Sequence, residues 1–432
     1  MTALDEVWTA TGGGPLPAPV TMHGSTGLAG PLAVEELALG SVAAQLLAAR
    51  KLQGDVQPLE LDAAHVGLAF RSERYVTRAG QPIGPGFAPL SRFFATSDGW
   101  VRLHANYPHH RAAVVAVLGD VDPDAVAASM RAVELEDAVV SAGGAAAALR
   151  DEAGWRSSPA GRAVADLPLL DLARVGDAPP RDLPPRGARV LDLTRVIAGP
   201  VATRTLASHG ADVLRLESPR LPEDAGTLAD TGSGKRTAVV DLATRSGRAT
   251  AEELLSGADV VVQGYRPGAL DAFGLDSASL ALRHPHLVVS RLSAWGVEGP
   301  WGGRRGFDSL VQVATGIAVA CGSAEAPGVL PAQALDHGTG HLAAAAVLRA
   351  LARRRTEGGT WHAELALART ASWLLAAPRH PDREAGPDVD LAPYLVDLPS
   401  AVGITSVIAP PGSPPWTATA QPVAEPLGWP NT

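Results

Sequence analysis

Asp336 is the residue whose position most directly suggests covalent chemistry. It follows an extended apolar stretch, residues 328–335, and precedes a helix rich in alanine and leucine. An aspartate at a helix start is a good N-cap, because its carboxylate accepts backbone N–H bonds. At the carboxyl end of an extended segment in an open α/β sheet, it can instead lie in a ligand site and act as a nucleophile. Gly338 and Gly340 favour this second interpretation, since they would keep bulk away from the carboxylate.

Other chemistries have weaker support in the sequence. His337 and His341 are four residues apart and would share a helix face, but no third metal ligand accompanies them. Glu217 ends an apolar run where an acid could hold a ribose, yet residues 194–203 contain no G-x-G-x-x-G for a pyrophosphate. The G-S-G-K at 232–235 lacks the full P-loop pattern. No G-x-S-x-G elbow occurs, so a serine hydrolase is not indicated.

Composition narrows the class of protein. The chain of 432 residues is 46% apolar, with a formal net charge of −9 and no long basic run. This predicts a globular protein that binds neither nucleic acid nor membrane. Cys321 is the only cysteine, which excludes an internal disulfide framework and fits a reducing cytoplasm. The first twenty residues lack the basic start and apolar core of a signal peptide.

The pattern along the chain predicts an α/β protein. After a Pro-rich segment, short apolar runs alternate with helical patterns from 187 to about 320, as in a doubly wound, mostly parallel sheet. Before it, helical spacing at 33–52 and 147–155 and a strand at 98–105 predict a smaller α+β domain. We expect five parts: a helical segment 1–70, a small α+β domain 71–175, a linker 176–186, a large domain 187–375 and a Pro-rich arm 376–432.

An internal repeat relates the two halves of the chain. Residues 35–67 run in parallel with residues 334–372. The alignment pairs Glu36 with Asp336, Gly40 with Gly340 and, after a short gap, Glu60 with Glu364. The two halves should therefore share one structural element, whereas the α/β pattern occurs once.

Long segments of the chain resemble a known family. These are residues 189–219, 234–276, 283–316 and 334–370, with motifs such as D-L-T-R-V-I-A-G-P, G-Y-R-P-G, G-F-D and A-L-D-H-G-T-G. They are similar to the family III CoA-transferases, the carnitine and formyl-CoA transferase type (CaiB/BaiF). Residues 90–119 resemble the small domain of the same family.

The resemblance implies a reaction and a set of site residues. It implies that an aspartate, here Asp336, attacks an acyl-CoA and forms an aspartyl anhydride and then an aspartyl-CoA thioester. No metal or redox cofactor is expected beyond the substrates, an acyl-CoA and a carboxylic acid. A homodimer is implied as well. The positions matching CoA-contacting segments are Val196, Ile197, Ala198, Arg220, Val240, Gly264, Tyr265, Phe273 and Arg305, with Arg220 replacing a basic residue at Ser218.

Two further functions stay open at this stage. Racemases of the same superfamily use a histidine where this chain has Phe307, and α-proton exchange needs two acid-base groups, so transfer is favoured over racemisation. A non-catalytic CoA-binding protein is the other alternative. It is suggested by the order of the parts, because a small-domain half precedes the α/β part as if two family chains had been cut and fused. The sequence does not decide whether the N-terminal half completes this site or a partner's.

Overall fold

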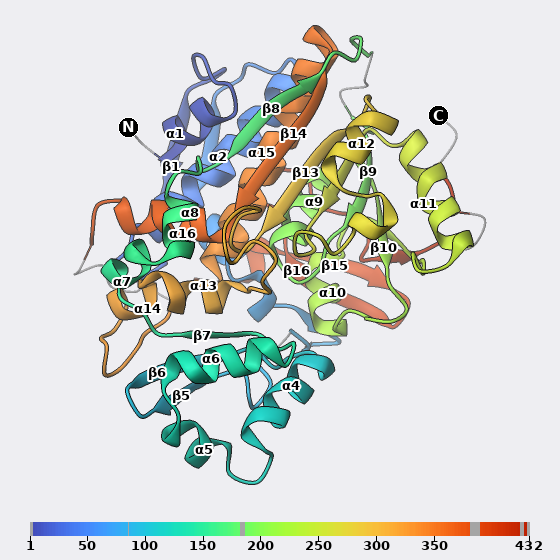
Figure 1. The fold of residues 1–432 in the computed structure, drawn as a ribbon. Helices are drawn as coiled ribbons and strands as arrows, with labels where there is room; N and C mark the ends of the chain where they lie inside the picture. The colour runs from blue at the N-terminus through green and yellow to red at the C-terminus, as the bar shows by residue number, and fades with distance from the viewer. Residues whose placement is uncertain (1–2, 85, 182–185, 381–388, 424–426, 430–432) are drawn as a thin grey trace.

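The computed structural model describes residues 3–84, 86–181, 186–380, 389–423 and 427–429. Its centre is an eight-stranded sheet in the order β17-β11-β10-β9-β12-β13-β14-β8 (Figure 1). All neighbouring pairs are parallel except β14 and β8, which are antiparallel. The strands are β8 (Asp171–Gly176), β9 (Arg189–Leu193), β10 (Asp212–Glu217), β11 (Lys235–Val239), β12 (Val260–Gln263), β13 (Val288–Ser293), β14 (Thr360–Ala366) and β17 (Gln421–Pro422).

Helices cover both faces of this sheet because its strands are apolar on both sides. On one face Val190 and Val260 belong to the same buried cluster as residues of α9 (Ala198–Ser208) and α15 (Ala334–Glu357). On the other, Leu191 packs in a second cluster with α11 (Arg245–Gly257) and α12 (Ser277–Arg283). The doubly wound α/β fold predicted from continuous apolar runs is confirmed. The order in which the chain adds strands to the sheet reverses between the parallel neighbours β9 and β12, and ligands bind beyond the strand ends at such a point.

The N-terminal segment packs onto this layer. It contains α1 (Ala3–Ala10), β1 (Val20–His23), α2 (Val34–Gln53), β2 (Leu59–Asp62) and α3 (Ala63–Ala69), and β1 pairs with β2 in parallel. α2 lies along α15, and residues of both helices share one hydrophobic core (Figure 1). The order α2, β2, α3 repeats the order α15, β14, α16 (Leu367–Ala376). Glu36 and Asp336 are each the third residue of their helix.

A small α+β part lies beside the large sheet. Its antiparallel strands β5 (Phe93–Thr96), β6 (Gly99–Leu103) and β7 (Ala146–Ala148) enclose a separate core with α4 (Pro108–Leu118), α5 (Pro123–Ser129) and α6 (Ala132–Ser141) (Figure 1). The helix predicted at 147–155 is only partly correct. Ala147 and Ala148 belong to β7, and α7 (Glu152–Ser157) begins after its N-cap residue, Asp151. α8 (Pro159–Ala165) follows, and β8 already belongs to the large sheet.

The remaining elements form a second small sheet and complete the large part. β15 (Leu395–Ser400) and β16 (Gly403–Ile408) form a hairpin that extends a sheet with β3 (Thr77–Arg78) and β4 (Gln81–Pro82). α10 (Ala225–Thr231), α13 (Asp308–Thr315) and α14 (Ile317–Ala320) complete the large part, with short 3₁₀ turns at Ser72–Arg74, Asp271–Phe273 and Ala392–Tyr394. Within the Pro-rich segment predicted as a linker, residues 182–185 lie outside the described residues.

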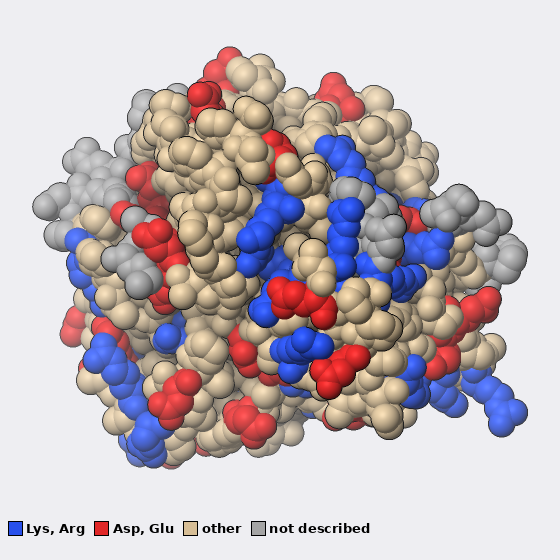
Figure 2. Space-filling model, turned by 90° about the horizontal axis from the view of Figure 1, so that it is seen from above, with Lys and Arg blue, Asp and Glu red and all other residues tan. Residues whose placement is uncertain are grey.

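The surface carries both signs of charge. Figure 2 shows acidic and basic side chains mixed together on the face seen from above. A short band of basic side chains lies near the middle of that face. None of the helices in the described ranges has the length and apolar character of a bilayer-spanning segment.

Candidate functional site

Asp336 does not cap its own helix. It is the third residue of α15, and the N-cap position, Gln333, makes no side-chain cap. The cap is supplied by Asp308 at the start of α13, whose Oδ2 accepts the backbone N–H of Leu335 at 2.9 Å and of Asp336 at 3.0 Å. Among the described residues, no side chain or amide donates to the Asp336 carboxylate, although the residue is only 6% exposed. The carboxylate is therefore free to react.

The surroundings of Asp336 make its carboxylate unusually basic. Burial raises the pKa of Asp336 well above its ordinary value, and the nearby carboxylates of Asp308 and Glu73 raise it further. Burial also raises the pKa of Asp308, while the amide of Gln312 and the two backbone N–H groups stabilise its ionised form. A desolvated carboxylate with a raised pKa is a better nucleophile than one in water.

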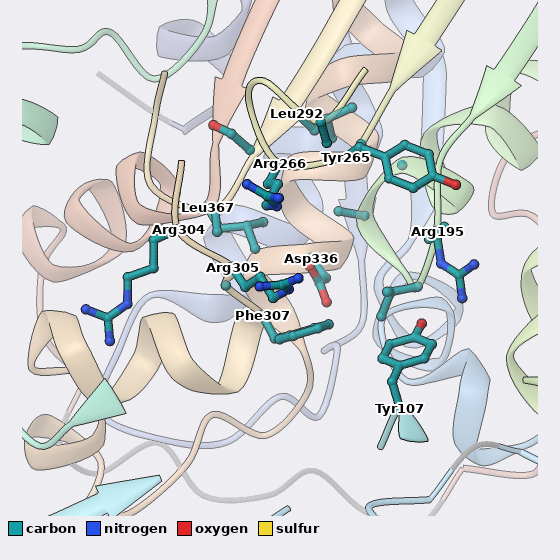
Figure 3. A pocket seen from close by; sticks show the side chains of 18 of the residues that line it. Tyr107, Arg195, Tyr265, Arg266, Leu292, Arg304, Arg305, Phe307, Asp336 and Leu367 are labelled. Atoms are coloured by element: carbon teal, nitrogen blue, oxygen red, sulfur yellow. The ribbon is translucent and has the colours of Figure 1, made fainter. Parts of the chain in front are cut away.

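Asp336 lies at the bottom of a cavity of about 250 Å³ at the carboxyl ends of the strands (Figure 3). The loops after β9, β12 and β13 form its walls. Tyr265 and Arg266 come from the loop after β12, and Arg305 comes from the segment before α13. In Figure 3 the Arg305 side chain lies beside Asp336, and the Arg266 side chain lies higher in the view. Five of the residues predicted from the resemblance line this cavity: Val196, Ala198, Gly264, Tyr265 and Arg305.

A second cavity, of about 230 Å³, continues from Tyr265 along the strand ends. Val240 and Phe273 line it with apolar surface, and Arg220 lies on its wall. The Arg220 guanidinium is mostly exposed and pairs with the Asp241 carboxylate at 3.1 Å. The structure thus brings these three predicted residues together beside the first cavity, and their contact with CoA stays a prediction.

The third cavity, of about 650 Å³, lies between the large sheet and the small α+β part, with Asp336 again in its wall. Val196, Ile197 and Arg220 line it from one side, while Tyr107, which precedes α4, and His109 in the first turn of α4 line it from the small part. Tyr107 and His109 were not among the predicted site residues. The cluster of aromatic and histidine side chains directly after a predicted strand was the available signal. Within one chain, the N-terminal half completes the cleft around Asp336.

The loop after β9 is held in an unusual conformation beside Asp336. Val196 has φ of +69°, a region that β-branched residues rarely occupy, and its N–H donates to Glu223 Oε2 at 3.0 Å. Beneath the loop, Lys235 Nζ donates to Asp192 Oδ2 and to the Pro200 carbonyl, each at 3.0 Å. Burial lowers the pKa of Lys235 to about 8 even though Asp192 opposes the shift. These buried contacts fix the wall of the cavity.

The expected role of the two glycines was wrong. A Cβ on Gly338 would lie 2.9 Å from the Leu37 side chain, and one on Gly340 would lie 2.5 Å from the carbonyl oxygen of Ala198. Both glycines therefore allow α15 to pack closely against α2 and α9, and neither opens space at the carboxylate.

The two histidines on α15 belong to the packing behind Asp336. His337 Nε2 lies 3.1 Å from Glu73 Oε2, and both histidine rings stack on Phe70, at 5.5 Å for His337 and 5.7 Å for His341. Burial lowers the pKa of His341 well below its ordinary value. No group of three histidine, cysteine, aspartate or glutamate side chains suited to a metal occurs in the part of the chain that the structure describes.

Phe307, the position at which racemases have a histidine, lies in the wall of the first and third cavities. Its ring stacks on the His104 ring with 3.6 Å between centroids. Burial lowers the pKa of His104 to about 3, so this imidazole is neutral near pH 7. Glu36, the counterpart of Asp336 in the repeat, lies instead 3.0 Å from His380 Nε2 and lines none of the three cavities.

Comparison with known proteins identifies relatives of the central segment. Residues 186–389 match the model of CoA-transferase family III. A probable fatty acyl-CoA transferase, Rv3272 of Mycobacterium tuberculosis, is 35% identical over 40% of this chain and 47% of its own length. The succinate–glutarate CoA-transferase of Agrobacterium fabrum is 31% identical over 52% of this chain and 63% of its own length. The superposition on the crystal structure of Rv3272 covers 44% of this chain and 56% of the Rv3272 chain, with a TM-score of 0.42 and 35% sequence identity.

The matches are partial on both sides. The chain spans about half the length of these curated relatives, 47% of one and 63% of the other. Further relatives carry names that specify succinyl-CoA with glutarate or L-malate. All of these names describe CoA-transferases, although the acids differ.

Proposed function

We propose that this chain transfers CoA between an acyl-CoA thioester and a carboxylic acid, with Asp336 as the nucleophile, because residues 186–389 match the model of CoA-transferase family III. The observation that carries the proposal is the state of the Asp336 carboxylate. It is buried, bonded to no donor among the described residues, and lies where the first and third cavities meet. A purely structural aspartate at a helix start would bond to the backbone, which Asp308 does here instead.

The proposed reaction conserves the acyl bond energy in two exchanges. An oxygen of Asp336 attacks the thioester carbonyl carbon and CoA leaves as a thiolate, which gives an aspartyl acyl anhydride. The thiolate then attacks the aspartyl carbonyl, releasing the first acid and leaving an aspartyl-CoA thioester. The acceptor acid attacks that thioester to form a new anhydride, and the thiolate takes the new acyl group and frees Asp336. Burial of Asp336 favours transfer over hydrolysis by limiting water.

The cavities offer suitable surroundings for CoA. Arg305 and Arg266 are cations at the wall of the first cavity and suit phosphate groups. Val240, Phe273 and Tyr265 supply apolar surface in the second cavity, where we place the adenine. The loop residues Val196, Ile197, Ala198 and Gly264 would bring backbone groups near the reacting thioester, and Arg220 is a further candidate for a phosphate. We propose no metal or redox group for this reaction.

The alternatives are weaker on this geometry. Racemisation needs a second acid-base group, and Phe307 occupies the matching position. A non-catalytic protein would have no use for a carboxylate kept desolvated and unbonded. The homodimer implied by the resemblance and the cytoplasmic location suggested by the single cysteine both stay predictions. Residues of both the large sheet and the small α+β part line the cleft within one chain.

The test is detection of the covalent intermediates. The purified chain is mixed with a panel of acyl-CoAs, quenched with hydroxylamine and analysed by intact and peptide mass spectrometry. We expect a hydroxamate at Asp336, and none in Asp336→Ala, which should still bind CoA. Absence of any adduct with every thioester, alongside measurable CoA binding, would favour the non-catalytic protein. Loss of folding in Asp336→Ala would indicate a structural role.

A further inference from the structure

We propose that the acyl groups exchanged here are monocarboxylic acids with an apolar chain or ring, and that a second carboxylate is excluded. This inference rests on the proposed function and concerns the third cavity, between the loop after β9 and the small α+β part. The cavity has a volume of about 650 Å³, which is ample for a medium-length acyl chain. Its chemistry, rather than its size, selects the substrate.

The position of Asp336 assigns the acyl group to this cavity. Asp336 lies in the walls of both the first and the third cavity. The first contains Arg266 and Arg305 and leads to the predicted CoA positions. With the CoA thiol in the first cavity and the thioester carbonyl at Asp336, the rest of the acyl group extends away from CoA, into the third. Because both anhydrides of the proposed reaction form at Asp336, the donor and the acceptor acyl groups occupy this cavity one after the other.

The wall of the third cavity is largely apolar and aromatic. Phe87 and Pro108 contribute from the small part, Ile197 and Leu221 from the large sheet's loops, and Phe307 from the segment before α13. Apolar substrate atoms gain about 0.8 kcal/mol for each methylene transferred from water to such a site. Each added methylene therefore improves binding until the cavity is full.

Charged groups at the cavity disfavour a second carboxylate. Glu223 and Asp224 line it, and Glu223 is a buried carboxylate that pairs with Arg195 at 3.3 Å. Arg220 is the only lysine or arginine among the described lining residues, and its guanidinium is 68% exposed and held by Asp241 through Nε and Nη2. Arg102 packs against the Phe87 ring, 5.1 Å from its centroid, and does not line the cavity.

Two of the polar side chains in the cavity wall already bond to other groups of the protein. Asn106 Oδ1 accepts bonds from the Ala88 N–H and the Ser91 hydroxyl, and Tyr107 donates to Glu223 at 2.9 Å. Burial lowers the pKa of His104 to about 3, so its imidazole is neutral near pH 7, and burial together with the charges of Arg305 and Arg195 lowers the pKa of His109. The arginines beside the cavity are already paired, Arg220 with Asp241 and Arg195 with Glu223, so a second carboxylate would be desolvated without an unpaired cation among the described lining residues, which is unfavourable.

The first half of the reaction tests this directly, because it needs only the donor. The rate of aspartyl-CoA formation is measured by rapid quench and intact mass spectrometry with octanoyl-CoA and with succinyl-CoA, which share the CoA portion. We expect kcat/KM for octanoyl-CoA to exceed that for succinyl-CoA by at least about tenfold. Equal rates, or faster reaction with succinyl-CoA, would overturn the inference while leaving the transferase intact.

A designed cation identifies the cavity responsible. Ala88 lines the third cavity, and Ala88→Arg keeps the backbone N–H that bonds to Asn106. This variant should lower the octanoyl to succinyl ratio at least about fivefold. The matched control, Val121→Arg, adds the same charge at a side chain that is 95% exposed and outside the cavity, and should leave the ratio unchanged. An unchanged ratio in Ala88→Arg would place the acyl group elsewhere.

Failure of the transferase itself gives a different result. If neither thioester modifies Asp336, the dissociation constants of octanoyl-CoA, succinyl-CoA and CoA are compared by calorimetry. Tighter binding of octanoyl-CoA than of CoA, with no gain for succinyl-CoA, would support the apolar cavity without catalysis. Equal binding of all three would overturn the inference.

Discussion

The carboxylate of Asp308 accepts the backbone N–H of Asp336 at 3.0 Å, so Asp308 caps α15, the helix that carries Asp336. Asp308 also accepts the N–H of Leu335 and lies at the start of α13. The two carboxylates are buried together, and burial raises the pKa of each. This division of roles leaves the Asp336 carboxylate unbonded among the described residues, which supports the nucleophile proposed above.

Asp336→Asn should stabilise the fold while abolishing the adduct. The folded-state pKa of Asp336 is raised above its ordinary value of 3.8, so the native state binds a proton more tightly than the unfolded chain does. Ionisation of Asp336 therefore destabilises the native protein as the pH rises through the raised pKa. The neutral amide avoids this cost, and we expect a gain of at least about 1 kcal/mol in the free energy of unfolding at pH 8.

The pH dependence provides the control for Asp336→Asn. Below pH 3.8 the carboxyl is protonated in both states, so the wild type and the variant should become equally stable. Urea unfolding at a series of pH values measures the difference. A variant less stable than the wild type at pH 8 would contradict the pKa shift and indicate a structural bond to the carboxylate.

Asp308→Ala should destabilise the protein through loss of the cap on α15. The N–H groups of Leu335 and Asp336 would lose their acceptor, and loss of an N-cap costs about 1–2 kcal/mol. Asp308→Asn retains a side-chain oxygen and is the matched control, with an expected cost below about 1 kcal/mol. Circular dichroism during urea unfolding compares the two. Equal losses would mean that the charge of Asp308 matters more than the cap.

Gly340→Ala should push α15 away from α9. The added Cβ would lie 2.5 Å from the Ala198 carbonyl oxygen and 2.9 Å from Val201, both in a well-packed region. Such overpacking costs about 1–3 kcal/mol, and thermal unfolding should show it as a lower Tm. Gly303→Ala is the control, because its Cβ would meet nothing within 4 Å. A Tm for Gly340→Ala equal to that of Gly303→Ala would refute the close approach.

Lys235→Met should strongly destabilise the wall beneath the cavity. Asp192 would remain fully buried without the ammonium that lies 3.0 Å away, and removal of one partner of a buried ion pair costs about 3–5 kcal/mol. The neighbouring Arg236→Met breaks a partly exposed pair with Asp212 and should cost less than about 1 kcal/mol. Guanidinium unfolding of both variants measures the contrast. Similar losses would indicate that Lys235 contributes through its stem alone.

The sequence by itself determined the central layer and the candidate nucleophile. Continuous apolar runs such as 260–263 satisfy both faces of a parallel strand, and that pattern is local, so it can be read without the fold. The position of Asp336 ahead of a long apolar helix, together with long motifs shared with a family, was also local information. The repeat of helix, strand and helix in the N-terminal half was visible for the same reason.

The tertiary structure alone decided what surrounds that nucleophile. Asp308 lies 28 positions before Asp336, and only folding brings its oxygen to the start of α15. Gly340 was taken as open space at the carboxylate, because its neighbour Ala198 is remote in the sequence. Likewise, Tyr107 reaches the cleft from a separate part of the chain. Contacts between segments that are distant in the sequence, and the charged groups that these contacts place near Asp336, depend on packing geometry that no local sequence pattern encodes.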